Sequence, residues 1–241
     1  MDIIVSEADG IRSLQLGPKM RLGTMQLDAP HLIDMAYARD LMAPLLLNAD
    51  PGWPRNALFI GLGVGATQQV LHKYRPDCVI TTVEIVEDMI KVAQDHFHLP
   101  PLSDNFQVVV QCGAEFMQNC TTQYDLIVLD AHTENPGSSP LESSDFYLNC
   151  KSCLSKQGYI VTNLLYPKPE FQAILGRFIK AFDYVSWTLR PWPTGNVILM
   201  SHTGAGFTIS EAELEENCRQ LSAKTGLDLT DTLKKLIVKM I

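Results

Sequence analysis

The spacing of hydrophobic residues changes near residue 57. Before that point, short alternating pieces are separated by Asp-Gly and Gly-Pro turn signals, which predicts a small antiparallel sheet. Across residues 29–47, apolar positions recur with a helical period, which predicts one helix that ends near Pro44 or at the turn NADPGWP. The first fifty residues are therefore expected to form a β-rich segment followed by a helix.

From residue 57 onward, continuous runs of Val, Ile and Leu alternate with amphipathic segments. Strands with no polar side are typical of parallel sheets that helices cover on both faces. Such strands are predicted at residues 57–63, 78–85, 106–113, 124–130 and 158–165. We therefore expect an α/β fold, with a doubly wound and mostly parallel sheet over residues 51–241 and a small N-terminal β appendage over residues 1–50.

Helices are expected between and after these strands. They are predicted at residues 66–75, 87–97, 146–154 and 169–182. Residues 184–190 and 196–202 are strand-like, and we expect them to close the sheet with antiparallel edges. Ser210 and Glu213 have the spacing of a capping box, which starts a further helix, and a last amphipathic helix follows.

The composition is that of an ordinary globular protein. The chain has 241 residues, of which 46% are hydrophobic, and this is enough for a sizeable core. A formal net charge of -8 argues against a sequence-independent grip on nucleic acid. Neither a long apolar run nor a signal-peptide pattern is present, so no membrane association is expected. The expected location is the cytoplasm.

The cysteines show no disulfide framework and are interpreted as reduced thiols. Cys150 and Cys153 have CxxC spacing, but they lie in a predicted helix and no second pair of metal ligands stands at a matching spacing. The histidines form no HExxH motif, so no metal site is expected. His96 and His98 are predicted to lie at a helix end.

A glycine-rich turn follows the first strand of the predicted parallel sheet, in the stretch LFIGLGVGATQQVL. Gly61, Gly63 and Gly65 let backbone N–H groups and a helix N-terminus approach a ligand without interference from Cβ atoms. Glu84 lies near the end of the next strand, where an acidic side chain accepts hydrogen bonds from ribose hydroxyls. These two features agree, and together they predict a nucleoside site.

The spacing G-x-G-x-G differs from the dinucleotide fingerprint. With the acidic strand end and the later stretch YDLIVLD, it resembles the class I S-adenosylmethionine-binding, methyltransferase-like Rossmann fold. The stretches RSLQLG, MQLD, VEIVEDMIKVAQDHF, YDLIVLDAH and FYLNCKSCLSKQGYIVTNL, in that order, look like the spermidine synthase (polyamine aminopropyltransferase) family. RPWPTGNVILMSH resembles a late stretch of the same family, so the likeness extends to about residue 205.

The resemblance implies transfer of an aminopropyl group from decarboxylated S-adenosylmethionine to a small-molecule acceptor such as a polyamine, by a homodimer that needs no metal. Carboxylates suit this chemistry, because donor and acceptor are cationic and the attacking amine must lose a proton. The implied catalytic residues are Asp130, Glu134 and His132, and the implied substrate contacts are Tyr37 and Thr133. The residues implied to bind the donor are Gly61, Leu62, Gly63, Gly65, Glu84, Ile85, Cys112, Gly113 and Asp130.

Several positions depart from the family's pattern. Val64 stands where the family has an aspartate that contacts the donor's amino group, and Cys112 falls where a carboxylate meets the adenine. Thr133 occupies the position of the general base, and Glu134 is displaced from it by one residue. Arg39 replaces an acid in the predicted N-terminal helix, and an arginine near a polyamine site would repel the ligand.

Three functions remain open at this point. The first is an active aminopropyltransferase that uses Asp130, with Glu134 or His132 in place of the missing base. The second is an S-adenosylmethionine-dependent methyltransferase, which the lost amine-binding acids favour and in which Arg39 could pair the donor's carboxylate. The third is a non-catalytic protein that binds a nucleoside or a protein partner.

Overall fold

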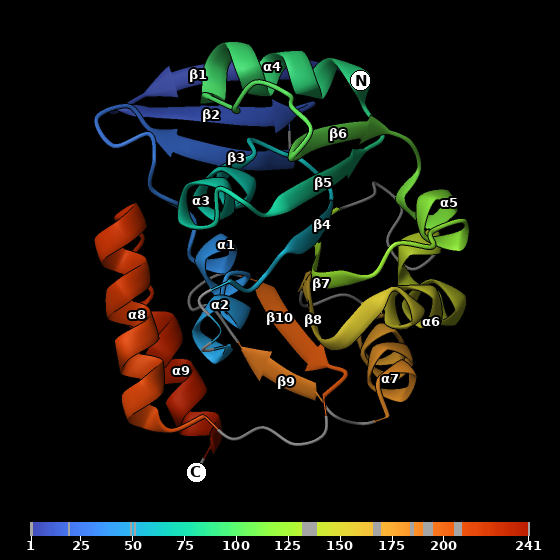
Figure 1. Ribbon diagram of the computed structural model, residues 1–241. Helices are drawn as coiled ribbons and strands as arrows, with labels where there is room; N and C mark the ends of the chain where they lie inside the picture. The colour runs from blue at the N-terminus through green and yellow to red at the C-terminus, as the bar shows by residue number, and fades with distance from the viewer. Residues whose placement is uncertain are drawn as a thin grey trace.

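The computed structural model of the chain describes residues 2–18, 20–48, 50, 52–131, 139–165, 170–183, 186–189, 195–204 and 209–240. Within these ranges the strands form two sheets, one of three strands and one of seven. Figure 1 shows the smaller sheet, in blue, beside one end of the larger one. The predicted β appendage is therefore present, and it lies against the α/β portion of the molecule.

The smaller sheet is antiparallel, as the turn signals predicted. It consists of β1 (Ile3–Ala8), β2 (Ile11–Leu16) and β3 (Met20–Gln26). Gly10, between β1 and β2, has a φ of 75°, a backbone conformation that glycine adopts without the steric cost of a Cβ atom. The pairing of β2 with β3 shifts its register after Leu14. Such an irregularity bends a strand, and here it lies where β3 approaches the larger sheet.

The larger sheet has the strand order β6-β5-β4-β7-β8-β10-β9. Its strands are β4 (Asn56–Ile60), β5 (Val79–Glu84), β6 (Phe106–Val110), β7 (Tyr124–Leu129), β8 (Leu154–Leu165), β9 (Ser186–Leu189) and β10 (Asn196–His202). The first five strands in spatial order pair in parallel, whereas β10 is antiparallel to β8 and to β9. The predictions of a mostly parallel sheet and of an antiparallel edge are both confirmed.

The order in which strands are added to this sheet reverses beside β4. The chain first adds β5 and β6 on one side of β4 and then crosses the sheet to add β7 on the other side. In an open α/β sheet, such a switch point leaves a crevice at the carboxyl ends of the two central strands. The residues that follow β4 and β7 are therefore the ones that the fold brings to a ligand.

Helices cover both faces of the larger sheet (Figure 1). One face packs against α3 (Ala66–Tyr74), α4 (Glu87–Phe97), α8 (Glu211–Thr225) and α9 (Thr230–Met240). The other face packs against α5 (Gly113–Gln118), α6 (Ser144–Ser152) and α7 (Phe171–Ala181). Side chains alternate along β4, so that Ala57 and Phe59 belong to the first core and Leu58 and Ile60 to the second. Of these helices, α5 was not predicted from the sequence.

The prediction of a single helix over residues 29–47 is wrong. The structure has two short helices, α1 (Ala36–Asp40) and α2 (Pro44–Leu47). Met35 is extended, with φ -80° and ψ 128°, and the guanidinium of Arg39 donates to the carbonyls of Ile33 and Asp34. These bonds hold the chain before α1 in a non-helical conformation. Pro44 cannot donate the next helical hydrogen bond, so α1 ends before it.

The C-terminal helix α9 is hydrogen-bonded to α1, and α8 precedes it. Ser210 and Glu213 form the predicted capping box at the start of α8, with both reciprocal bonds present. In α9, Thr232 and Lys235 bind the buried carboxylate of Asp40, with donor to acceptor distances of 2.6 and 2.7 Å. A buried carboxylate is stable only with such partners. The C-terminus therefore supports the helix that carries Tyr37.

The cysteines of the CxxC pair and the two histidines of α4 lie away from the crevice, in the core or at a helix end. Cys150 and Cys153 are buried, one in α6 and one at its end, and neither is in a disulfide. Burial, followed by contact with Cys120, raises the pKa of the Cys153 thiol to about 11, which keeps it protonated and unreactive. His96 lies in the last turn of α4 and His98 caps it, as predicted. Among the described helices, none is long and apolar enough to cross a membrane.

Candidate active site

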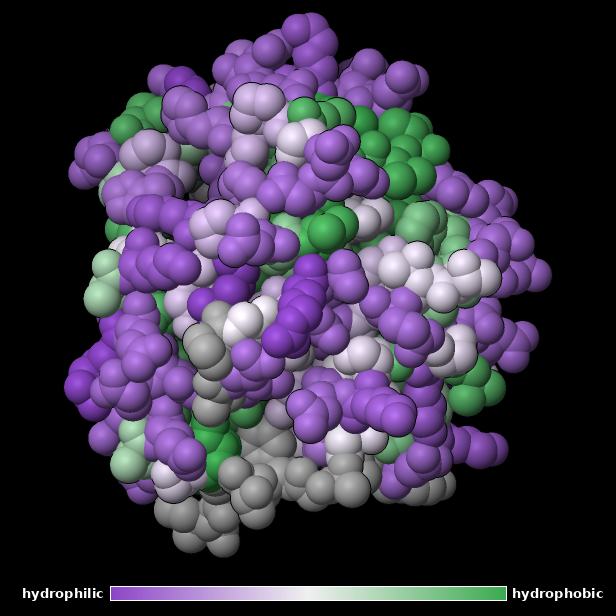
Figure 2. Space-filling view, in the orientation of Figure 1, coloured by the Kyte–Doolittle hydropathy of each residue, from purple (hydrophilic) through white to green (hydrophobic). Residues whose placement is uncertain are grey.

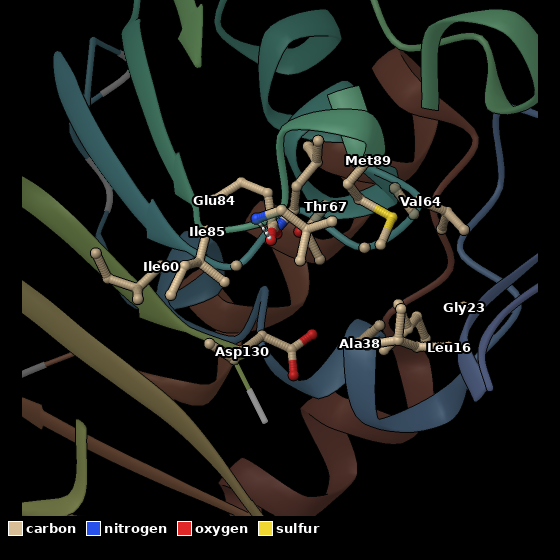
Figure 3. Close-up of a pocket in the computed structure, with 18 of the residues that line it drawn as sticks. Leu16, Gly23, Ala38, Ile60, Val64, Thr67, Glu84, Ile85, Met89 and Asp130 are labelled. Carbon is tan, nitrogen blue, oxygen red and sulfur yellow. Dashed lines mark hydrogen bonds between the residues drawn. The ribbon is translucent and has the colours of Figure 1, made fainter. Parts of the chain in front are cut away.

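A cavity of about 320 Å³ opens at the carboxyl ends of β4, β5, β6 and β7, at the switch point of the sheet. Glu84 and Asp130 lie on opposite sides of this cavity (Figure 3). Its outer wall comes from β3 and from the residues before α1. The volume falls at the lower end of the range typical of small-molecule sites.

The glycine-rich turn forms one side of the cavity. Gly61, Gly63 and Gly65 have φ angles of 103°, 53° and 72°, which favour glycine. A Cβ atom on Gly61 would lie 2.4 Å from the carbonyl oxygen of Asp130. This turn therefore needs glycine for two reasons, its left-handed backbone and the close approach of the chain after β7.

Val64 has a packing role that the sequence did not show. Its side chain is buried, and a Cβ atom on Gly23 of β3 would lie 2.6 Å from its Cγ2 atom. Figure 3 shows both residues on the same side of the cavity. The glycine turn is thus packed directly against the N-terminal sheet, and an apolar side chain suits this contact better than a carboxylate.

Glu84 is buried at the end of β5 and lines the cavity. One carboxylate oxygen accepts a hydrogen bond from the backbone N–H of Leu62 at 3.0 Å, and the other accepts from the N–H of Val86 at 2.9 Å. Each oxygen retains a further lone pair. Glu84 therefore orders the glycine turn and has capacity for hydroxyl donors from a ligand.

Three further residues predicted to bind the donor, Ile85, Cys112 and Gly113, line the cavity. Ile85 is 68% exposed, and Cys112 and Gly113 line the cavity at the start of α5. A Cβ atom on Gly113 would lie 2.5 Å from Cγ2 of Ile60, so glycine allows α5 to start close to β4. An exposed isoleucine beside a cavity is a suitable surface for the flat face of a purine.

Asp130 and Tyr37 meet on the side of the cavity opposite Glu84. Burial, followed by the charge of the nearby Asp130 carboxylate and its capacity to accept from the Tyr37 hydroxyl, raises the pKa of Tyr37. Asn163 of β8 donates to Asp130 Oδ1 at 2.9 Å, and Asn196 of β10 donates to Asn163 at 2.9 Å. Asn163 thus helps to orient the carboxylate, and Figure 3 shows it pointing toward the side where Ala38 lies.

The remaining predicted catalytic and substrate residues, His132, Thr133 and Glu134, lie outside the described residues.

Arg39 was expected near the ligand, but the structure corrects this: its guanidinium donates to the carbonyls of Ile33 and Asp34, and Arg39 does not line the cavity. Its guanidinium is therefore not placed to contact a ligand in the cavity directly.

The structure brings residues into the wall that the sequence analysis did not single out. They are chiefly Arg21, Gly23 and Thr24 of β3 and Asp34 before α1. Nothing in the local pattern separates them from ordinary strand or loop residues. Within the described parts of the chain, no group of three or more His, Cys, Asp or Glu residues is arranged to hold a metal ion.

The sequence model of the Spermine/spermidine synthase domain matches residues 35–210. A polyamine aminopropyltransferase of Chromobacterium violaceum is 30% identical over 235 residues, which cover 98% of this chain and 89% of that protein. The chain belongs to the spermine/spermidine synthase family. The departures from the family's motifs, such as Val64 and Cys112, are therefore differences within a member of this family.

Solved structures share the fold of this spermine/spermidine synthase family member. A probable spermidine synthase from Corynebacterium glutamicum has a TM-score of 0.75 at 17% identity, covering 91% of this chain and 83% of that one. Human methyltransferase-like protein 13 in complex with SAH has a TM-score of 0.69 at 22% identity, covering 86% and 100%. At these identities the likeness concerns the fold, which is the predicted methyltransferase-like Rossmann type.

Proposed function

We propose that this protein transfers an aminopropyl group from decarboxylated S-adenosylmethionine to an amine acceptor of the polyamine class. The observation that carries the proposal is the cavity at the switch point, which has Glu84 on one side and Asp130 on the other. The family supports it, because the C. violaceum relative is a polyamine aminopropyltransferase.

The residues of the cavity fit an adenosyl donor. The glycine turn lines the cavity at the N-terminus of α3, Glu84 can accept from ribose hydroxyls, and Ile85 is placed to cover a purine. Cys112 and Gly113 would border the base, and Leu62 would contact the nucleoside through the backbone. Among the described residues, no side chain fills the cavity along this path.

Asp130 is the proposed catalytic residue. An acceptor amine bound at its carboxylate would lose a proton to it before attacking the carbon next to the donor sulfur. Asn163 donates to the same carboxylate and helps to hold it in one orientation as the amine approaches, and the Tyr37 side chain is near enough to feel its charge. Alignment of the amine with the breaking carbon–sulfur bond would supply much of the remaining rate enhancement. In this proposal His132, Thr133 and Glu134 stay candidate contributors.

The direct test is an assay with decarboxylated S-adenosylmethionine and a series of diamines. Formation of methylthioadenosine and of the aminopropylated amine, in equal amounts, is the expected result. If neither product forms while the donor binds, the protein is a non-catalytic binder. If no adenosyl ligand binds at all, the nucleoside site itself is refuted.

A methyltransferase is the second candidate, and one observation favours it. Arg21 lines the cavity on β3, so a cation lies on the same wall as the acid Asp34. An amino-acid tail, with an ammonium and a carboxylate, suits such a pair better than a decarboxylated tail does. Tighter binding of S-adenosylmethionine than of its decarboxylated form, measured by calorimetry, would support this candidate and contradict the leading one.

Replacing Glu84 by alanine is expected to weaken methylthioadenosine binding by about 1 to 3 kcal/mol, through lost charge-assisted hydrogen bonds and a less ordered glycine turn. Calorimetric titration of the nucleoside measures the effect. Glu87→Ala is the matched control, because Glu87 is an exposed acid three residues later that does not line the cavity. Equal affinities for the wild type and Glu84→Ala would remove Glu84 from the site.

A homodimer and a cytoplasmic location remain predictions for this protein. Exposed apolar side chains are compatible with a dimer: Ile4 of β1 and Val110 of β6 are 39% and 47% exposed. Figure 2 shows hydrophobic residues gathered in the upper half of a mainly hydrophilic face, the half in which Figure 1 places these strands. Analytical ultracentrifugation would measure the subunit number directly.

A further inference from the structure

Asp34 is an acid of the cavity wall that the predicted mechanism does not use. It lies two residues before α1, on the segment expected to be helical, and it lines the cavity together with Thr24 of β3. Because the chain there is extended at Met35, the side chain of Asp34 is directed to β3 and not along a helix. The correction to the predicted helix thus places a carboxylate in the site.

The position of Asp34 is fixed by two donors. Thr24 Oγ1 donates to Oδ2 at 2.7 Å, and Gln26 Nε2 donates to Oδ1 at 2.9 Å. Both bonds satisfy one lone pair on each oxygen, and a carboxylate has about two more to offer. Arg39, the nearest cation in the sequence, binds the main-chain carbonyl of Asp34. The carboxylate is therefore held in place while keeping capacity for a further donor.

Asp34 shares the cavity with Val64, which stands at the position whose acid is missing. Val64 packs against Gly23 of β3, and Thr24, whose side chain points to the other face of that strand, holds Asp34. Val64, Gly23, Thr24 and Asp34 all line the same cavity. The wall beside the glycine turn therefore has a carboxylate after all, supplied by the segment before α1.

We propose that Asp34 binds the terminal ammonium group of the donor's aminopropyl chain, in place of the acid that Val64 replaces. The proposal rests on the proposed function, since it assigns a role in donor binding to one more residue of that site. Val64, Leu22 and Met35 line the wall around Asp34 and would contact the methylene groups of the chain. Arg21 and Thr24 line the same wall, so the site is only partly apolar; where water is excluded, a charge-assisted hydrogen bond is stronger than at an exposed surface.

The test compares three adenosyl ligands by calorimetry. Decarboxylated S-adenosylmethionine has both the sulfonium and the ammonium group. The dimethylsulfonium analogue of adenosine keeps the sulfonium and lacks the ammonium, and methylthioadenosine lacks both. Asp34→Asn preserves the size of the side chain and one oxygen acceptor. Asp104→Asn is the matched control, because Asp104 is exposed and does not line the cavity.

In Asp34→Asn, binding of decarboxylated S-adenosylmethionine is expected to weaken about tenfold, as for the loss of one hydrogen bond to a charged group. The other two ligands are expected to bind this variant and the wild type equally. Equal weakening of all three would show that Asp34 acts through the fold, and no weakening would show that it does not touch the donor; either result overturns the inference. If the wild type binds none of the three ligands, the result refutes the proposed function itself and not only the role of Asp34.

Discussion

Replacing Asp130 by asparagine is expected to lower kcat about 10²- to 10⁴-fold, the usual contribution of a general base. Asparagine keeps the size of the side chain and an oxygen that can accept from Asn163. It cannot take a proton from the acceptor amine, and it presents no negative charge to that amine. The loss should therefore appear in turnover, whereas methylthioadenosine, which has no amine to activate, should bind as before.

Steady-state rates with saturating donor and acceptor measure this effect, with methylthioadenosine affinity as the check on folding. Asp104→Asn, on the surface away from the cavity, controls for the loss of one negative charge. Tyr37→Phe removes a hydroxyl near Asp130 and should give a smaller loss, because Asn163 still holds the carboxylate. A kcat within about threefold of the wild type in Asp130→Asn would place the base elsewhere.

Replacing Gly61 by alanine is expected to destabilise the fold as well as the site. The left-handed φ of 103° costs an alanine about 1 to 3 kcal/mol. The new Cβ atom would stand 2.4 Å from the carbonyl oxygen of Asp130, and moving the chain apart should cost about 1 to 3 kcal/mol more. Because that chain segment carries Asp130, the same displacement should reduce activity in the molecules that remain folded.

Urea unfolding of Gly61→Ala measures the stability change, and Gly176→Ala is the matched control. Gly176 lies inside α7, and a Cβ atom there meets no other atom within 4 Å. Alanine at that position should leave stability unchanged or raise it by about 0.5 to 1 kcal/mol, because glycine is the poorer helix former. Equal unfolding midpoints for the two variants would contradict the close approach of β4 and β7 at the cavity.

Most elements were predictable because their signals are local. The parallel strands are continuous apolar runs, α4 has the bounds that its periodicity predicted, and the capping box at Ser210 marks the start of α8. Two predictions failed where local signals were weak or misleading. The short helix α5 was not recognised at all. The helical period across residues 29–47 was real, but Arg39 bonds the preceding carbonyls and Pro44 interrupts the helix.

The candidate site was likewise predictable only where the signals in the sequence are local. Because parallel strands end at one edge of a sheet, the sequence placed Gly61, Glu84 and Asp130 at one crevice, and the described cavity contains all three. Val64 was interpreted as a lost acid, yet it is also a packing contact with Gly23. That contact joins residues about forty positions apart, so no periodicity or motif could have indicated it.

Patterns along the chain were therefore sufficient for the class of fold, the order of its elements and the loops that carry polar groups, because hydrophobic period and turn chemistry act over a few residues. The positions of Asp34 and Arg39 relative to the cavity depended on how the N-terminal sheet packs on the glycine turn. Whether a side chain there points toward the cavity is decided by contacts between segments far apart in sequence, and only the folded molecule brings those segments together.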